Sequence, residues 1–380
     1  MDFLTQIPSM GVHLLIYVIP PFLFVLTMVV FFHELGHFLV ARWCGVRVRA
    51  FSLGFGKELF GFDDKHGTRW KVSMLPLGGY VQFMDDDNAT SVPTSGQNEA
   101  AGDHDEGRFH TKPLWQRTAV VAAGPLANFL LAIVIFAGVF MVVGERTLAP
   151  RVDAVMENSA ASDAGFEKGD IILGIDGQTI STFRDLVKIV TASADEELAF
   201  TVERAGREMV LRATPRRQEV TDRFGNTYKQ GRLGISQSAT PAEREHKDVG
   251  PIRAIMLGAD ETYFYTWRTL QFIKDIFVGK EEVKQLGGPI RIAKVSSDFA
   301  TLGPQALIQI VAVLSISIGL LNLFPVPMLD GGHLLFYAIE AIRGQPLSER
   351  AQEFGFRIGL TLVIMLMIFT TWNDATWLIS

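Results

Sequence analysis

Two histidines and a glutamate stand inside one of the most apolar stretches of the chain, residues 29–43 (VVFFHELGHFLVARW). His33 and His37 are four residues apart, so on a helix they lie about 40° apart around the axis and one turn apart along it, close enough to hold one metal ion. Glu34 is rotated by about 100° from His33, which takes it off the ligand face but lets it reach a water molecule at the metal. The spacing therefore predicts hydrolytic zinc chemistry, with Glu34 as general base and then proton donor to the leaving amine.

A packing role is the alternative for these three side chains, because short patterns arise by chance and a lone histidine on an apolar helix is usually a packed residue. An ionisable side chain at the centre of a membrane helix costs about 2.5–3.5 kcal/mol on insertion scales, and such residues usually face a cavity, a partner or a functional site. Three of them at metal spacing in one apolar segment favour the metal site over packing.

A catalytic zinc site needs a third protein ligand and an open position for water. The segment LNLFPVPMLDGG, residues 321–332, follows an apolar run, is broken by prolines and ends in glycines, so its backbone cannot be plain helix. Irregular backbone at membrane depth is tolerated only inside protein or beside water. Asp330 in this segment is the main candidate for the third ligand and His333 is its competitor, and the preference for Asp330 rests partly on the resemblance described below.

Three more residues near these motifs admit two interpretations each. Asn322 lies near the end of an apolar helix, where its amide can contact a peptide backbone or satisfy a carbonyl of the broken helix, and the residues alone favour neither. Gly124 and Asn128 in AAGPLANF raise the same question. There helix packing is favoured, because small residues let helices approach closely.

Four apolar segments are long enough to hold these residues in a membrane. The first has no charged residue, and at about 1.5 Å of rise per residue it can cross a hydrocarbon core of roughly 30 Å. The predicted spans are residues 12–32, 118–143, about 304–326 and about 356–378.

The composition agrees with a protein that is part membrane and part aqueous domain. Of its 380 residues 48% are hydrophobic and 20% are charged, too apolar for an ordinary soluble enzyme and too charged for a pure membrane bundle. The net charge of -6 and the lack of a nucleic-acid-binding motif argue against nucleic acid as a partner. Cys44 is the single cysteine and cannot form an internal disulfide, so the sequence leaves the redox compartment open.

Basic residues near the span ends predict the topology. Those that flank the loop after the first span are Arg42, Arg47, Arg49 and Arg117, and those between the third and fourth spans are Arg343, Arg350 and Arg357. The positive-inside rule places both loops in the cytoplasm. Both termini and residues 144–303 are then expected outside, in the periplasm of a Gram-negative bacterium.

The segments between the spans differ in character. Residues 46–56 and 70–83 are rich in β-branched and aromatic residues, which predicts short strands or hairpins close to the membrane. The acidic stretch 85–107 predicts a flexible surface loop. Residues 150–216 predict a compact mixed domain with a hairpin turn at Ala205-Gly206.

Residues 251–280 mix aromatic and charged residues at helical spacing, which predicts an amphipathic helix against the membrane or the core. The sequence thus predicts four consecutive regions. The regions are an N-terminal membrane half (1–143), an aqueous domain (144–240), the amphipathic helix with its connections (241–303) and a C-terminal membrane half (304–380).

The ordered motifs resemble the site-2 protease family of intramembrane zinc metalloproteases, and within it the bacterial regulator of sigma-E protease group. In chain order they are FFHELGHFLVAR, FSLGFG, LPLGGYVQF, KPLWQR with AAGPLANF, AGFEKGDIILGIDG and NLFPVPMLDGGH. The resemblance implies a polytopic α-helical inner-membrane protein with about four transmembrane helices, a membrane-associated β-hairpin region and one periplasmic PDZ-like α+β domain. The well-known enterobacterial member carries two PDZ domains in tandem, whereas this sequence has the pattern of one.

The resemblance also implies roles for single residues. Zinc would be held by His33, His37 and Asp330, with Glu34 as the catalytic carboxylate. The implied substrate-binding residues are Asn322, Pro325, Gly54, Gly78 and Gly79. Expected substrates are single-pass membrane proteins in the bilayer, such as an anti-sigma factor or leftover signal peptides, after a first cut by an upstream periplasmic protease.

Two other classes of protein compete with a protease. One is a membrane-anchored PDZ adaptor with a structural zinc site, which would close the metal with four protein ligands and would not need Glu34. The other is a metal or ion transporter, which is expected to show polar positions along several spans, whereas the second and fourth spans show few.

Overall fold

Four helices of the computed structural model are long and apolar enough to cross a membrane, and each corresponds to one predicted span. The structure describes residues 14–84, 107–221, 227–237 and 245–379. The candidate spans are Ile16–Trp43, Leu114–Val143, Pro304–Asn322 and Glu349–Leu378. The first helix continues past the predicted end of its span, so the whole HELGH motif lies on one continuous helix.

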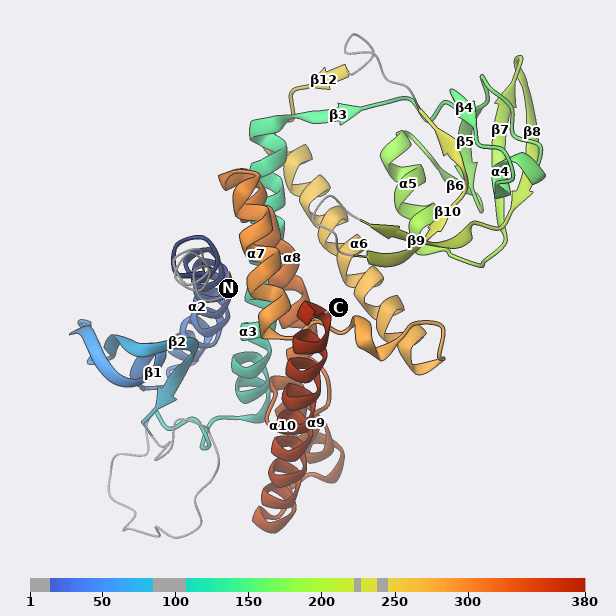
Figure 1. Cartoon of the computed structure of the whole chain (residues 1–380). Coiled ribbons are helices and arrows are strands. Elements are labelled where there is room, and N and C mark those ends of the chain that lie inside the picture. The colour runs from blue at the N-terminus through green and yellow to red at the C-terminus, as the bar shows by residue number, and fades with distance from the viewer. Residues whose placement is uncertain (1–13, 85–106, 222–226, 238–244, 380) are drawn as a thin grey trace, which may run out of the picture. The chain divides into compact units, whose positions relative to one another are not determined.

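The chain divides into two compact units, the first formed by residues 1–136 with 286–380 and the second by residues 137–285 (Figure 1). The first unit contains the π-helical turn η1 (Leu14–Val18), α2 (Ile19–Trp43), β1 (Val48–Asp63), β2 (Arg69–Phe83), the larger part of α3 (Leu114–Val143), α7 (Pro289–Thr301), α8 (Pro304–Asn322), α9 (Asp330–Arg343) and α10 (Glu349–Ile379).

Helix α2 is central to the first unit, because it packs against β2, α7 and α8. Apolar side chains from its C-terminal half, the hairpin and α3 form one core, with Phe38, Phe51, Phe83 and Val120 among its members. Its N-terminal half contributes to a second core with α3 and α8. The two cores hold the helix that carries the histidines against three neighbouring elements.

The two predicted strand segments form one antiparallel hairpin, β1 with β2. The turn between them is built by Asp64, whose carboxylate accepts hydrogen bonds from the backbone N–H groups of His66 (2.8 Å) and Thr68 (3.0 Å), and by Gly67 at φ +80°. On β2, Trp70 stacks on Phe51 with ring centroids 4.4 Å apart. The predicted acidic loop falls almost entirely outside the described residues.

Small residues bring the helices of the first unit into close contact. A Cβ atom at Gly36 of α2 would overlap the carbonyl of Ala123 on α3, and one at Gly319 of α8 would approach the carbonyl oxygen of Pro125 to 3.2 Å. Backbones this close leave no room for larger side chains. As a result, α3 lies within reach of polar groups on α2.

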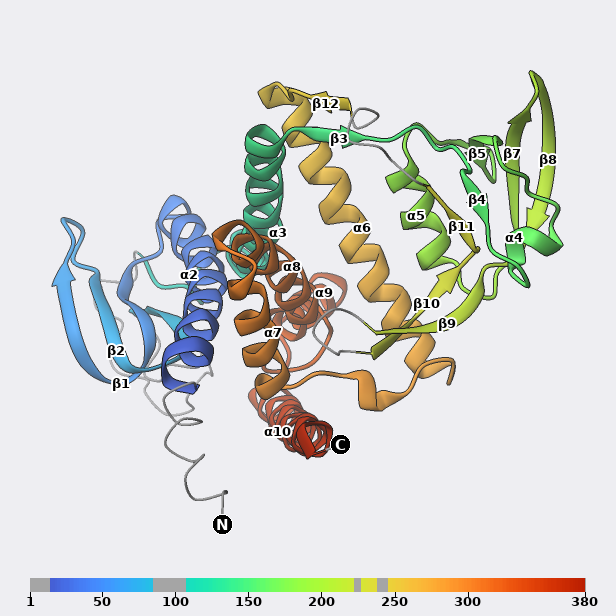
Figure 2. The same ribbon diagram turned by 45° about the horizontal axis from the view of Figure 1, so that its top comes forward.

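The second unit is a mixed α/β structure around a four-stranded sheet of order β6-β5-β7-β8. Its elements are β3 (Glu145–Thr147), β4 (Ala154–Val155), α4 (Ala160–Asp163), β5 (Ile171–Ile175), β6 (Gln178–Thr179), α5 (Phe183–Ala192), β7 (Leu198–Arg204), β8 (Arg207–Ala213), β9 (Arg216–Thr221), β10 (Thr227–Arg232), β11 (Ile235–Ser236), β12 (Glu245–Lys247), α6 (Pro251–Phe277) and the 3-10 turn η3 (Val283–Gln285). Figure 2 shows α5 beside this sheet, and both contribute side chains to one buried core.

Local sequence signals explain several turns of this unit. The hairpin predicted at Ala205-Gly206 is confirmed: both residues have positive φ, and Arg204 pairs with Arg207. Helix α5 starts in a capping box, where the Thr182 hydroxyl accepts the Asp185 N–H and the Asp185 carboxylate accepts the Thr182 N–H.

Candidate metal centre and catalytic site

His33 and His37 face each other from successive turns of α2. Their Nε2 atoms lie 3.2 Å apart, and both rings are largely buried. Because the helix continues without a break through both residues, their spacing follows directly from the sequence. The structure therefore places the two nitrogen atoms as the helical repeat predicts.

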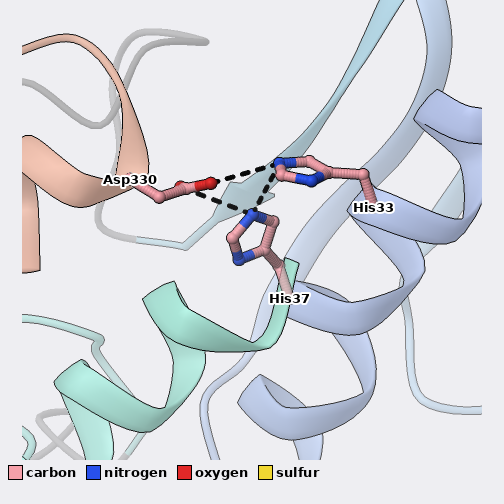
Figure 3. A group of neighbouring side chains, drawn as sticks. All are labelled: His33, His37 and Asp330. Carbon is pink, nitrogen blue, oxygen red and sulfur yellow. Dashed lines mark hydrogen bonds and ion pairs between the residues drawn. The ribbon is translucent and has the colours of Figure 1, made fainter. Parts of the chain in front are cut away.

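Asp330 reaches the same point from the first residue of α9 (Figure 3). One carboxylate oxygen lies 3.2 Å from Nε2 of His33 and the other 3.5 Å from Nε2 of His37. The segment that joins α8 to α9 folds back over the start of α9, where a Cβ atom at Gly331 or Gly332 would overlap its carbonyl groups. The two glycines after Asp330 thus permit the bend that points the carboxylate at the histidines.

These three side chains fit a zinc ion by donor type and by spacing. Ligands at about 2.0–2.1 Å from a tetrahedral zinc ion lie about 3.3 Å from one another, close to the distances between these donor atoms. Among the described residues, they form a group of three His, Cys, Asp or Glu side chains that lie close enough together to share one metal ion. His333, the competing ligand, is not in this group and its ring lies 5.3 Å from that of Phe356.

Helix α3 supports the ring of His37. Nδ1 of His37 donates a hydrogen bond of 2.8 Å to the carbonyl oxygen of Val120, which leaves the Nε2 lone pair free for a metal. A Cβ atom at Gly124 would collide with the same ring. Gly124 therefore leaves room for the ring of a candidate ligand. This agrees with the packing interpretation of Gly124 and makes that packing necessary for the metal site.

Glu34 lines the same cavity as the three candidate ligands. Its carboxylate accepts a backbone hydrogen bond from Val81 of β2, and a Cβ atom at Gly79 would approach its Cγ to 3.0 Å. The hairpin thus holds Glu34 beside the metal group and outside the set of ligands. This is the placement that a general base requires.

The cavity has a volume of about 590 Å³ and is partly polar. Its polar lining beyond the metal group includes His110, Arg117, Asn322, His333, Glu340 and Gln352. Arg117 of α3 makes a bidentate ion pair with Glu340 of α9, with N–O distances of 2.5 and 3.2 Å. Sequence reasoning missed this pair, whose only signal is one charged residue beside each of two apolar segments.

The predicted substrate-binding residues fall into two groups. Asn322 and Gly79 line the cavity, and Nδ2 of Asn322 lies 3.3 Å from Nε2 of His33. Pro325, Gly54 and Gly78 do not line it. Gly54 has φ +88° and a backbone position where a Cβ atom would meet the Leu75 carbonyl at 2.7 Å, so the hairpin itself requires a glycine there.

Helices long enough to span a membrane, a buried His-His-Asp group and an adjacent glutamate define a membrane metalloprotease. The model of peptidase family M50 matches residues 21–366. The chain belongs to this family, the zinc-dependent site-2 proteases, and is a multi-pass membrane protein.

Similarity to individual proteins covers almost the whole chain. It is 49% identical over 363 residues to the "Putative zinc metalloprotease Atu1380" of Agrobacterium fabrum, and the matched region covers 95% of this chain and 96% of the relative. It is 38% identical over 375 residues to metalloprotease MmpA of Caulobacter vibrioides, and here the matched region covers 93% of this chain and 94% of the relative. The expected family and its zinc cofactor are thereby confirmed.

Proposed function

We propose that this zinc metalloprotease cleaves within the membrane, hydrolysing peptide bonds in or near the transmembrane segment of single-pass proteins. The observation that carries the proposal is the cavity shared by Glu34, His33, His37 and Asp330 in a unit of membrane-length helices. Three protein ligands leave a coordination position for water, whereas a structural zinc site is closed by four.

The chain's own groups divide the reaction between them. His33, His37 and Asp330 would hold the zinc ion, which when bound supplies a Lewis acid that lowers the pKa of water and polarises a carbonyl. Glu34 takes the proton from the attacking water and gives it to the leaving amine nitrogen. The polar side chains of the cavity provide the environment through which water reaches Glu34.

The hairpin is the proposed substrate platform. Peptide bonds in a helix are hydrogen-bonded and shielded, so a transmembrane substrate must be extended before water attacks it. Gly79 and Val81 of β2 line the cavity beside Glu34, which supports addition of a substrate strand at this point. Asn322, whose Nδ2 lies 3.3 Å from Nε2 of His33, is proposed to hold the extended peptide beside the metal group.

The topology and the aqueous domain extend the proposal. The arginines of the two loops favour an orientation with those loops in the cytoplasm, and so with both termini of the proposed inner-membrane protein in the periplasm. Residues 144–240 are proposed as one periplasmic PDZ-like domain, in support of which the second unit pairs a small antiparallel sheet with two short helices. Such a domain would admit substrates that an upstream periplasmic protease has shortened, such as an anti-sigma factor or a leftover signal peptide.

Two variants in detergent test the proposal, with zinc content and cleavage of a tagged single-pass protein as readouts. Glu34→Gln is expected to keep zinc and lose cleavage, and Asp330→Ala to lose both. Cleavage by Glu34→Gln, or an unaltered chain that binds no zinc, would contradict the proposal, whereas an unaltered chain that binds zinc and cleaves nothing would favour the adaptor with its structural zinc.

A further inference from the structure

Asn128 of α3 is completely buried, and its amide faces the ring of His33 on α2. Its Nδ2 lies 3.2 Å from Nδ1 of His33, and its Oδ1 is buried with no hydrogen-bond partner among the described residues. A buried polar atom without a partner costs about 1–3 kcal/mol. An amide oxygen in this position, next to a histidine nitrogen, needs a physical account.

The protonation of a metal-binding histidine supplies that account. Nε2 of His33 faces His37 and Asp330, so this nitrogen must offer its lone pair to a metal ion. A neutral imidazole then carries its hydrogen on Nδ1. The Asn128 NH₂ group and the His33 Nδ1–H would be two donors facing each other, with no acceptor between them.

Rotation of the Asn128 amide by 180° resolves this conflict. The oxygen and nitrogen of the amide exchange places without a change of shape, and only the hydrogen-bond network decides between the two orientations. After rotation, Oδ1 accepts the hydrogen of His33 Nδ1. A donor–donor contact becomes a hydrogen bond, and Nδ2 is left as the one unpartnered amide atom where both had been without a partner.

We propose that Asn128 is a positioning residue that accepts the Nδ1–H of His33 and so fixes the tautomer and ring orientation with which His33 meets zinc. The inference rests on the ligand set of the proposed function. His37 has its own partner in the carbonyl of Val120, so α3 orients both histidines of α2. Groups of this kind typically contribute 10- to 100-fold to metal affinity.

The surroundings of Asn128 support this positioning role. It does not line the cavity, so it does not contact a substrate there. Its backbone carbonyl accepts a 2.9 Å hydrogen bond from the Ser315 hydroxyl of α8, and a Cβ atom at Gly319 would meet its Cβ at 3.0 Å. With α8 packed this closely, the amide is confined to the position beside His33.

The test measures zinc affinity of the full chain in detergent by competition with a chelator, and the visible absorption of the Co²⁺-loaded protein. Asn128→Leu keeps the size but removes the acceptor, and is expected to bind zinc 10- to 100-fold more weakly. Asn128→Asp keeps an acceptor for the same hydrogen, and is expected to bind zinc at least as tightly as the unaltered chain and to shift the Co²⁺ spectrum. Leu131→Ala, a truncation elsewhere in the buried face of α3, is the control and should lower thermal stability without changing zinc affinity.

Each outcome supports or overturns the inference. Unchanged zinc affinity in Asn128→Leu, or a loss that Asn128→Asp shares in full, overturns it. If Asn128→Leu does not accumulate, Asn128→Asp alone decides, because an unchanged Co²⁺ spectrum contradicts a contact with His33. Failure of the ligand set is distinguishable, since then substitution of His33 itself would leave zinc bound.

Discussion

Nε2 of His37 lies 3.5 Å from Oδ1 of Asp330, although His37 stands on α2 and Asp330 begins α9, near the other end of the chain. The contact exists because the glycines after Asp330 let the preceding segment fold over the start of α9. The metal group therefore depends on a helical repeat within α2 and on tertiary packing between α2 and α9.

Loss of either histidine should remove zinc, whereas loss of a third histidine in the same cavity should not. His33→Ala and His37→Ala each delete a ligand, so zinc affinity is expected to fall by more than the roughly 100-fold typical of an outer partner, and cleavage with it. His333→Ala is the matched control, because His333 lines the cavity outside the ligand group. Metal content by atomic emission checks this. One zinc per chain in His37→Ala would refute the assignment.

A single methyl group on α3 should disturb the site. Gly124→Ala places a Cβ atom against the His37 ring, so the ring must move and zinc affinity is expected to drop at least 10-fold. Gly138→Ala on the same helix meets nothing within 4 Å and is expected to be neutral or to stabilise the helix by up to about 1 kcal/mol. Chelator competition compares the two, and equal zinc affinity in both would show that the ring of His37 tolerates the methyl group.

The ion pair between Arg117 and Glu340 should hold α9 against α3. Both side chains are about 15% exposed or less, so removing one leaves a nearly buried charge. Glu340→Ala is expected to lower the free energy of unfolding by about 3 kcal/mol, whereas Glu353→Ala, in an exposed pair with Arg357, should change it by less than about 1 kcal/mol. Unfolding in mixed detergent measures both variants. Equal effects would mean that the buried pair contributes no more than the surface pair.

Acid should weaken the sheet of the second unit through Asp170. Burial alone would raise the pKa of this carboxyl, but hydrogen bonds from Arg204 and from the Glu167 N–H outweigh it and hold the pKa below its usual value. Since the folded pKa is the lower one, the stabilisation is complete above the unfolded pKa of about 4 and is lost as pH falls through the folded value.

Hydrogen exchange of peptides from β5 and β7, corrected for intrinsic rates, measures that loss. Asp170→Asn is expected to reduce protection at neutral pH by about 3 kcal/mol and to flatten its fall below pH 4. Glu167→Gln changes an exposed partner of Arg204 and should stay within about 1 kcal/mol of the unaltered chain. If Asp170→Asn keeps the full acid dependence of protection, that dependence arises from another carboxylate.

Local sequence signals predicted the elements well, because each signal acts over a few residues. Apolar length located the four spans, Ala205-Gly206 located a hairpin turn, and His33 with His37 predicted two ligands on one helix face. Asp330 was favoured over His333 partly by resemblance, since composition alone does not show which of two donors faces a metal. The structure brings Asp330 to the group.

Contacts between distant elements were beyond the sequence. The sequence around Asn128 and Gly124 favours packing, and the charge of Arg117 indicates only topology, because a pattern shows that a residue is small, polar or charged and not which atom it will meet. The helical repeat of α2 fixed the spacing of the histidines, since periodicity is a property of the backbone. Their partners at Asp330, Val120 and Asn128 were decided by tertiary structure, because close helix packing sets which side chains meet across the chain.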